Sequence, residues 1–155
     1  YPLDAIHHWN RIYGKRGFYQ FQSVIPDAGA AEGMRRMLEA ISGARAGSFL
    51  AVLKTLGGEG RGHLSFPMRG YTLALDFPRR DRVEDLLARL AAISLDQGGR
   101  VYLAKDAVLD AGSFARMYPK LGEFRNVLDS IDPERRMQSD MARRLNIREN
   151  VGVPS

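Results

Sequence analysis

The sequence contains no cysteine, and only three of its 155 residues are histidines. Without cysteine the protein can form no disulfide, no thiolate nucleophile and no cysteine-ligated metal site, although this absence says little about compartment. His7, His8 and His63 lack the spacing of metal ligands and have no paired carboxylates nearby. We therefore expect surface histidines and no metal.

Long apolar runs and a signal-peptide pattern are also missing from the printed sequence. No stretch approaches the ~20 apolar residues of a membrane-spanning helix, so we expect no segment that crosses a bilayer. There is no signal-peptide pattern and no initial methionine, and the chain opens at Tyr1-Pro2 as though it were cut from a longer protein. A composition of 45% hydrophobic and 26% charged residues is typical of one globular domain, with or without a tail.

Acidic residues are in the minority, with 18 against 23 basic residues and a net charge of +5. This excess indicates an anionic partner only weakly, because most charged side chains on a protein surface are simply solvated. The arginine pairs are scattered through the chain and are typical of solvated helix faces and ends.

Four segments show the two-residue alternation of a β-strand, and apolar residues at helical spacing follow the first and third of them. The expected strands are 18–25, 48–56, 70–78 and 100–105. The order strand, helix, strand, strand, helix, strand predicts an α+β fold of the ferredoxin-like βαββαβ type, with an antiparallel sheet and both helices on one face. A helical C-terminal segment follows.

Short polar motifs suggest where the helices begin. Asp27 is a candidate N-cap of the first helix, and Asp81 with Glu84 forms a capping-box-like pair before the second. Asp132-Pro133 is typical of the start of a later helix. Residues 57–62, GGEGRG, lack the Lys-Ser/Thr of a phosphate-binding loop and are expected to form a flexible connector.

The alternation separates two faces of the predicted sheet. We expect the helices to cover the large apolar side chains, namely Tyr19, Phe21, Phe49, Leu53, Tyr71, Leu73, Leu75 and Phe77. The opposite face then carries Gln20, Gln22, Lys54, Thr72, Ala74, Asp76 and Tyr102. Amides, an ammonium group and a hydroxyl can bind a polyhydroxylated or phosphorylated ligand.

The pattern of this face has two other interpretations. The same pattern also fits a plain solvated sheet surface. An RNA-binding sheet would need stacking aromatics, but the register that exposes Tyr71 also exposes Leu73 and Leu75, so we expect no nucleic-acid partner.

Longer stretches resemble a known family. They are YPLDAIHHWNRIYG, GFYQFQSVIP, SFLAVLKTLG, LSFPMRGYTLALDFP, GGRVYLAKDA, FARMYPKL and DPERRMQSDMARRL. In order, they resemble the C-terminal part of flavin-dependent oxidases of the vanillyl-alcohol-oxidase type. Within that group they are most similar to the decaprenylphosphoryl-β-D-ribose 2′-oxidases and, more distantly, to the sugar-lactone (D-arabinono-1,4-lactone) oxidases.

The resemblance implies a division of the chain and a reaction. Residues 1–104 would belong to a substrate-binding cap domain, and residues 105–155 would form a helical segment that packs back toward an absent FAD-binding domain. That absent domain would hold most of the FAD, so the isolated chain is expected to be inactive. The implied reaction is oxidation of a secondary alcohol of a sugar or polyprenyl-phosphoryl sugar by hydride transfer to flavin N5. A partner reductase would complete an epimerisation. The protein itself would be cytoplasmic and would associate with the membrane through its lipid-linked substrate.

The resemblance also implies roles for individual residues. The implied substrate-binding residues are Gln20, Gln22, Lys54, Thr72 and Ala74. Tyr102 and Lys105 would reach the flavin, and Lys54 and Lys105 are the candidate catalytic residues. The chain differs from the mycobacterial enzymes at two of these positions, where they carry Cys in place of Ala74 and Asn in place of Thr72.

A different class of function remains open from the residues alone. The chain could be a stand-alone ferredoxin-like module that binds a small ligand on its sheet or dimerises through it. About 200 or more upstream residues with a flavin-domain pattern would distinguish the enzyme from this module.

Overall fold

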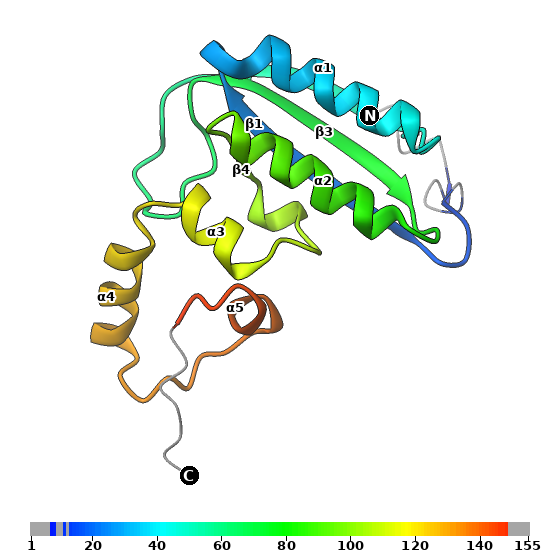
Figure 1. The fold of residues 1–155 in the computed structure, drawn as a ribbon. Coiled ribbons are helices and arrows are strands. Elements are labelled where there is room, and N and C mark those ends of the chain that lie inside the picture. The colour runs from blue at the N-terminus through cyan, green and yellow to red at the C-terminus, as the bar shows by residue number, and fades with distance from the viewer. Residues whose placement is uncertain (1–6, 9–10, 12, 149–155) are drawn as a thin grey trace.

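The computed structural model describes residues 7–8, 11 and 13–148 of the chain. It contains a four-stranded antiparallel sheet with two long helices on one face (Figure 1). The elements of this layer pair are β1 (Phe18–Pro26), α1 (Asp27–Gly43), β2 (Ala51–Leu56), β3 (Gly70–Pro78), α2 (Val83–Asp96) and β4 (Arg100–Val101). The strand order is β2-β3-β1-β4, which confirms the α+β fold class and is compatible with the ferredoxin-like topology.

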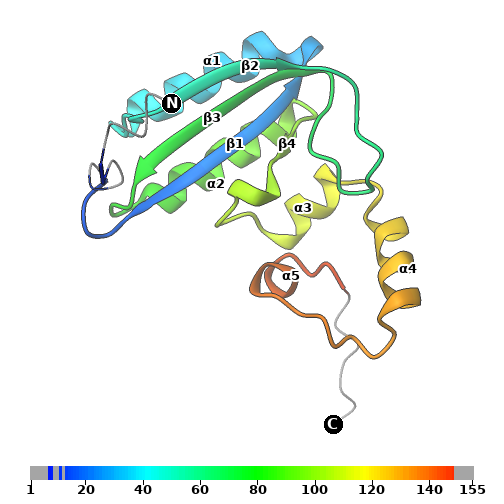
Figure 2. The ribbon, with the colours of Figure 1, turned by 180° about the vertical axis from the view of Figure 1, so that it is seen from behind.

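The C-terminal segment is helical, as expected, and most of it extends away from the sheet (Figure 2). Its elements are the 3₁₀ turn η3 (Leu103–Lys105), α3 (Ala111–Met117), α4 (Leu121–Ile131) and α5 (Asp140–Arg144). Phe114 lies in α3 and Tyr118 follows it directly, and both are buried in the hydrophobic core that the sheet also lines. The Tyr118 hydroxyl donates to the Val101 carbonyl oxygen over 2.6 Å, so this part of the segment is anchored to β4.

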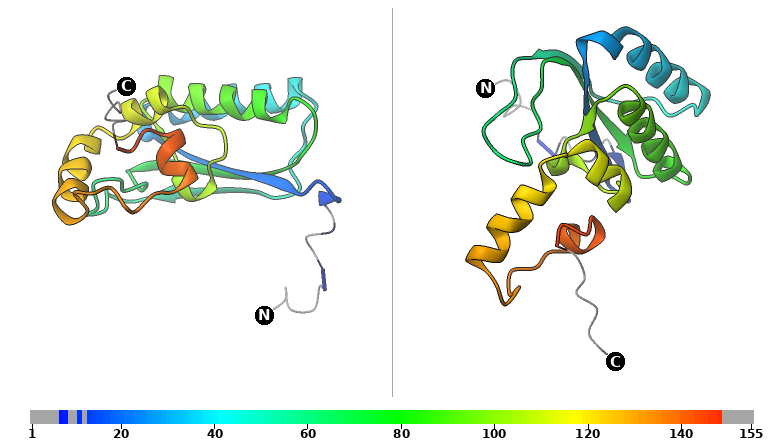
Figure 3. Two further views of the ribbon diagram at one scale, coloured as in Figure 1. Left: turned by 90° about the horizontal axis from the view of Figure 1, so that it is seen from below. Right: turned by 60° about the vertical axis from the view of Figure 1, so that its left-hand side comes forward.

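The predicted alternation determines which side chains form the core. Phe21 lies opposite Leu75 in the β1–β3 ladder, and both are at most 3% exposed beneath the helices. Their neighbours Gln22 and Ala74 form the next pair and therefore face the other side of the sheet. The seen-from-below view in Figure 3 shows α1 and α2 together on one side of the strands.

The helical layer does not extend over the β2 edge of the sheet. Leu53 and Tyr71, both predicted to be covered by the helices, are 59% and 39% exposed. Phe49, predicted to be covered as well, is exposed and packs edge-on against Tyr13, with ring centroids 5.6 Å apart. The prediction was wrong at these positions because α1 and α2 pack on β1, β3 and β4 and leave β2 uncovered, which alternation alone cannot reveal.

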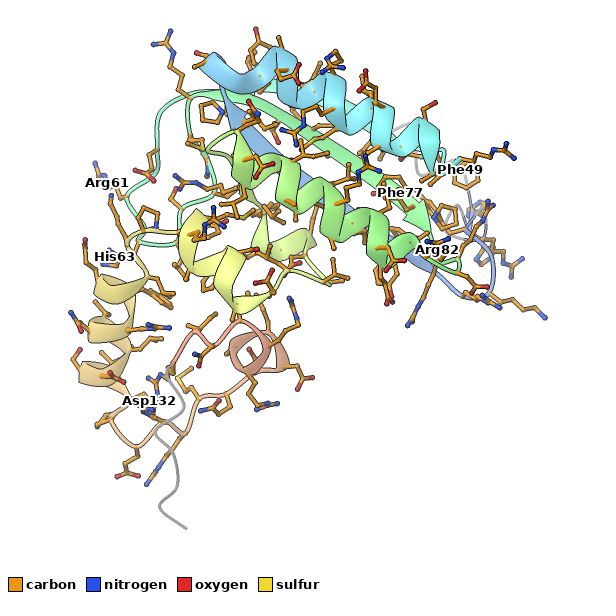
Figure 4. The ribbon with its side chains drawn as sticks, in the orientation of Figure 1. Phe49, Arg61, His63, Phe77, Arg82 and Asp132 are labelled. Carbon is orange, nitrogen blue, oxygen red and sulfur yellow. The ribbon has the colours of Figure 1, made fainter. Side chains whose placement is uncertain are left out.

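Phe49 also lies outside the strand, since β2 begins only at Ala51. The Asp76 amide N–H donates to the Leu50 carbonyl oxygen over 3.2 Å and to the Ser48 hydroxyl over 2.9 Å, which holds this segment beside β3. Figure 4 shows Phe49 at the end of the sheet that also carries Phe77 and Arg82, away from the loop with Arg61 and His63.

The predicted helix starts were wrong in detail. Asp27 is the first residue of α1 and forms an ion pair with Arg69 over 3.1 Å, while Pro26 is the cap residue and makes no side-chain bond. Arg82, in the left-handed region with φ 66°, precedes α2, so the Asp81–Glu84 pair forms no capping box.

Asp132 does not begin a helix either. Its carboxylate accepts from the backbone N–H groups of Arg136 and Met137, and thereby closes a turn after α4. The helix that follows, α5, is capped by Ser139, whose hydroxyl accepts from the Ala142 N–H over 3.0 Å. A local Asx-type turn was more favourable here than a helical start.

β4 is shorter than the expected strand 100–105. Its last ladder bond runs from the Tyr102 N–H to the Gln22 carbonyl oxygen over 2.8 Å, and the chain then enters η3, where the Lys105 N–H donates to the Tyr102 oxygen.

Among the residues that the structure describes, no helix is long and apolar enough to cross a membrane.

Candidate functional site

The sheet face opposite the helices carries the predicted substrate-binding residues on neighbouring strands. Thr72 of β3 lies between Val24 of β1 and Lys54 of β2, and Ala74 lies between Gln22 and Val52. The Gln22 Nε2 donates to the Thr72 Oγ1 over 3.0 Å. Gln22, Lys54, Thr72 and Ala74 are therefore brought together in the middle of this face.

Gln20 lies further along β1, opposite Asp76 of β3. Its Nε2 donates to the Asp76 Oδ1 over 3.2 Å, and the Tyr13 hydroxyl donates to the Asp76 Oδ2 over 2.9 Å. Asp76 is only 3% exposed. Burial and, next in size, the hydrogen bond to Asp76 raise the pKa of Tyr13 to about 12.

Tyr13 was missed by the sequence analysis. Its ring stacks on Phe18 with centroids 4.0 Å apart and covers this end of the face. The segment before β1 has no strand or helix period, so nothing in the sequence pattern places its side chains against the sheet.

Lys105 is brought next to Gln20 by the early end of β4. The two residues line a hollow of about 270 Å³ together with Phe18, Tyr19, Ala104, Asp106 and Ala107. β4 pairs only with Ser23 and Val24, and the bond from Tyr102 to the Gln22 oxygen continues the ladder by one step. By the alternation of an antiparallel ladder, the main-chain groups of Gln20 point to the same side, toward this hollow.

The floor beside Lys105 is held from the C-terminal segment. Asp106 has a side chain 2% exposed, and its Oδ2 lies 2.8 Å from the Arg144 Nη2 of α5. The other carboxylate oxygen accepts from the backbone N–H groups of Val108 and Leu109. The C-terminal segment thus supports the turn that carries Lys105.

Tyr102 lies beside Gln22 on this face and contacts the β2–β3 loop. Its ring centroid is 4.6 Å from that of Phe66, which this loop contributes. Arg100, 8% exposed, donates through Nη1 to the Glu59 Oε1 over 2.9 Å and to the Ser65 carbonyl oxygen over 2.7 Å. The Arg100 guanidinium lowers the pKa of the Glu59 carboxyl.

These contacts modify two expectations. The glycine-rich segment, predicted to be a flexible connector, is anchored through Glu59. The face predicted to be open is partly covered, since Asp76 near one end is 3% exposed and Thr72, predicted to bind substrate, is only 1% exposed. What stays accessible is the stretch between the ends, with Gln20 and Lys54 exposed and Gln22, Ala74, Tyr102 and Lys105 half-buried.

Other parts of the described chain offer less chemistry. No group of three or more histidine and carboxylate side chains is placed to hold a metal ion there. A larger hollow, of about 520 Å³, lies between α4 and α5 and is lined by apolar residues such as Phe124 and Leu128. It contains none of the predicted site residues.

Comparisons with known proteins agree with the resemblance read from the sequence. The family model for D-arabinono-1,4-lactone oxidase matches residues 74–145, from within β3 to the end of α5. The chain is 38% identical over 147 residues to decaprenylphosphoryl-β-D-ribose oxidase of Mycolicibacterium smegmatis. The matched residues cover 95% of this chain and 32% of that protein.

A second relative is a Streptomyces coelicolor protein described as an uncharacterized protein in the mprA 5′ region. It is 33% identical over 120 residues, or 77% of this chain and 33% of that protein. The chain therefore spans about a third of the length of each of these curated relatives. It is a relative of decaprenylphosphoryl-β-D-ribose oxidase and, over residues 74–145, of the D-arabinono-1,4-lactone oxidases.

Proposed function

We propose that this chain is the substrate-facing part of a larger FAD-linked oxidoreductase that oxidises a secondary alcohol of a sugar or polyprenyl-phosphoryl sugar. The observation that carries the proposal is the gathering of Gln20, Gln22, Lys54, Thr72 and Ala74 on one sheet face. Its support from outside the chain is the similarity to an oxidase whose name specifies a polyprenyl-phosphoryl sugar.

The residues present fit part of a flavin site. Lys105 brings an ammonium group to a hollow that Gln20 also lines, and a hollow of about 270 Å³ has room for part of a ring system but not for a whole dinucleotide. This agrees with FAD held mainly by a domain outside these 155 residues. When bound, FAD would supply an acceptor at N5 for the hydride of the carbinol carbon, and the alcohol would become a ketone once its hydroxyl proton passes to a base.

The side chains of the chain bind and stabilise the substrate in this proposal. The amide groups of Gln20 and Gln22 hydrogen-bond sugar hydroxyls beside Thr72 and Ala74. Lys54 and Lys105 are the candidates for stabilising negative charge that develops at the reacting oxygen or on the reduced flavin, as a fixed cation can. Tyr102 and Lys105 are the groups proposed to reach the flavin.

The division of the chain belongs to the same proposal. Residues 1–104 form a portion of the cap domain, and residues 105–155 return toward the FAD-binding domain. The ion pair between Arg144 and Asp106 supports this division, because it ties the C-terminal segment to the turn that carries Lys105. A partner reductase that reduces the ketone product on its other face would complete an epimerisation. Similarity to two longer relatives, of which the matched residues make up about a third, favours this over a stand-alone ligand-binding module.

Flavin-reduction kinetics on the longer protein that contains this chain tests the proposal. The flavin absorbance is followed after mixing with polyprenyl-phosphoryl sugars, free aldonolactones and simple alcohols. We expect bleaching with a sugar class and not with simple alcohols. Reduction by none of the sugars, or tight stoichiometric FAD binding by the 155 residues alone, contradicts the assignment.

A further inference from the structure

Asp76 is a buried carboxylate on the candidate site face that none of the proposed roles uses. It is 3% exposed, and each of its oxygens accepts a hydrogen bond from a different neutral side chain, Gln20 or Tyr13. The Ser48 hydroxyl also bonds its backbone, donating to the Asp76 carbonyl oxygen over 2.8 Å. The carboxylate is thus held on both sides and through its main chain.

The chemistry of a carboxylate determines the orientation of the Gln20 amide. An ionised carboxylate only accepts hydrogen bonds, so the group of Gln20 that faces it must be the NH₂ and not the carbonyl. The Gln20 Oε1 then points away from Asp76, on a residue that is exposed beside Lys105. At Gln22 the partner is the Thr72 hydroxyl, which can donate or accept, so no such constraint applies there.

We propose that Asp76 is a positioning residue that fixes the Gln20 amide with its carbonyl oxygen toward the ligand, so that this point of the site accepts a hydrogen bond from a substrate hydroxyl. The inference rests on the proposed function for the identity of the ligand, a hydroxylated sugar. Tyr13 supports this arrangement, because its hydroxyl donates a hydrogen bond to the second carboxylate oxygen of Asp76. The arrangement selects a hydroxyl at this point over a carbonyl or an anionic oxygen.

Asp76→Asn inverts this polarity with little change in volume. The buried Tyr13 hydroxyl still donates a hydrogen bond, and its acceptor is now the carbonyl oxygen of the introduced Asn. The NH₂ group of that Asn therefore faces Gln20. Gln20 then turns its own carbonyl inward and presents NH₂ to the ligand. Gln20→Glu alone sets two carboxylates against each other, but the double variant Gln20→Glu/Asp76→Asn restores both the internal pairing and an outward acceptor oxygen.

The first readout is NMR on the isotope-labelled longer protein that contains this chain. We expect the Gln20 side-chain NH₂ to be protected from exchange and to show a hydrogen-bond coupling to the Asp76 carboxyl carbon, and we expect Asp76→Asn to abolish both. An unprotected, uncoupled NH₂ in the unsubstituted chain overturns the proposal, even if the Asn variant fails to fold.

The second readout is KM in the FAD-loaded longer protein, with decaprenylphosphoryl-β-D-ribose and D-arabinono-1,4-lactone as the probes. We expect each single variant to raise KM about tenfold or more, and the double variant to recover most of that loss. Failure of the double variant to recover KM, with the fold intact, contradicts a positioning role. If neither probe is oxidised by the unsubstituted protein, the proposed function fails, while the NMR result still decides the role of Asp76.

Discussion

The two ends of the candidate site face are each closed by a buried charged residue, but the two charges are satisfied in different ways. Asp76 is held by neutral donors, Tyr13 and Gln20, whereas Arg100 is held by the carboxylate of Glu59 and a carbonyl oxygen. The Arg100 Nε is buried and has no hydrogen-bond partner among the described residues, although the guanidinium lies 5.4 Å from the Tyr118 ring centroid. The Asp76 end therefore depends on neutral hydrogen-bond donors, and the Arg100 end depends on an ion pair.

Removing the cation at the Arg100 end has the largest expected effect on stability. Arg100→Met leaves Glu59 and the Ser65 carbonyl without their donor, and we expect the free energy of unfolding to fall by about 3 kcal/mol. Glu59→Gln is the matched control, because Glu59 is partly exposed and Gln keeps an acceptor; about 1 kcal/mol is expected. Denaturant unfolding measures both. A loss below 1 kcal/mol for Arg100→Met would remove the distinction between the two ends.

Between the ends lies Lys54, where function and not stability should respond. We expect Lys54→Ala to lower turnover of the longer protein by about 100-fold while its flavin content is unchanged, because a cation near the reacting oxygen is lost. Thr55→Ala is the matched control, since the next residue of β2 faces the other side of the sheet. Steady-state kinetics and flavin absorbance make the comparison. Unchanged turnover of Lys54→Ala would exclude Lys54 from the site.

At the Asp76 end a single hydroxyl can be removed with little change in shape. Tyr13→Phe leaves one oxygen of the buried Asp76 carboxylate without its donor, and we expect a loss of about 1–2 kcal/mol in unfolding free energy. Tyr19→Phe is the control, because the Tyr19 hydroxyl makes its bond to Glu84 at the surface. A change below about 0.5 kcal/mol is expected there. Equal losses for the two variants would argue against a specific role for Tyr13.

The free energy of unfolding should change with pH in opposite directions at the two ends. This is the smallest of the expected effects. The pKa of Glu59 is lowered in the folded chain, so its contribution is complete above the usual glutamate pKa of ~4.3 and is lost as the pH falls through the lowered value. The pKa of Tyr13 is raised to about 12, so its contribution is complete below pH ~10 and is lost as the pH rises toward that value.

The measurement is the unfolding free energy against pH for the unsubstituted chain, Glu59→Gln and Tyr13→Phe. We expect the Glu59→Gln difference to vanish in acid and the Tyr13→Phe difference to shrink in alkali. The opposite pattern, or two differences that do not vary with pH, would show that these two groups do not hold the ends in the manner described.

Much of the candidate site could be predicted from strand alternation. The placement of Gln20, Gln22, Lys54, Thr72 and Ala74 on one face requires only that each strand be recognised and its register be regular, and the observed ladders meet both conditions. The same alternation places Arg100 on this face, opposite Val24, but a charged side chain in a strand does not reveal its partner in a distant loop.

Helix starts and coverage were harder to predict, for a physical reason. Asp132 can cap a turn or a helix with similar local contacts, and which of the two forms depends on the surrounding packing. Whether Leu53 is covered depends on how far two helices reach across four strands. Neither question is answered by residues that are close in sequence.

The sequence by itself determined the two faces of the sheet and the polar character of one of them, because the two-residue period of a strand is a local property. Only the tertiary structure decided which part of that face stays accessible. Tyr13 and Glu59 reach it from segments without a regular period, and their hydrogen bonds to Asp76 and Arg100 depend on contacts 63 and 41 residues apart.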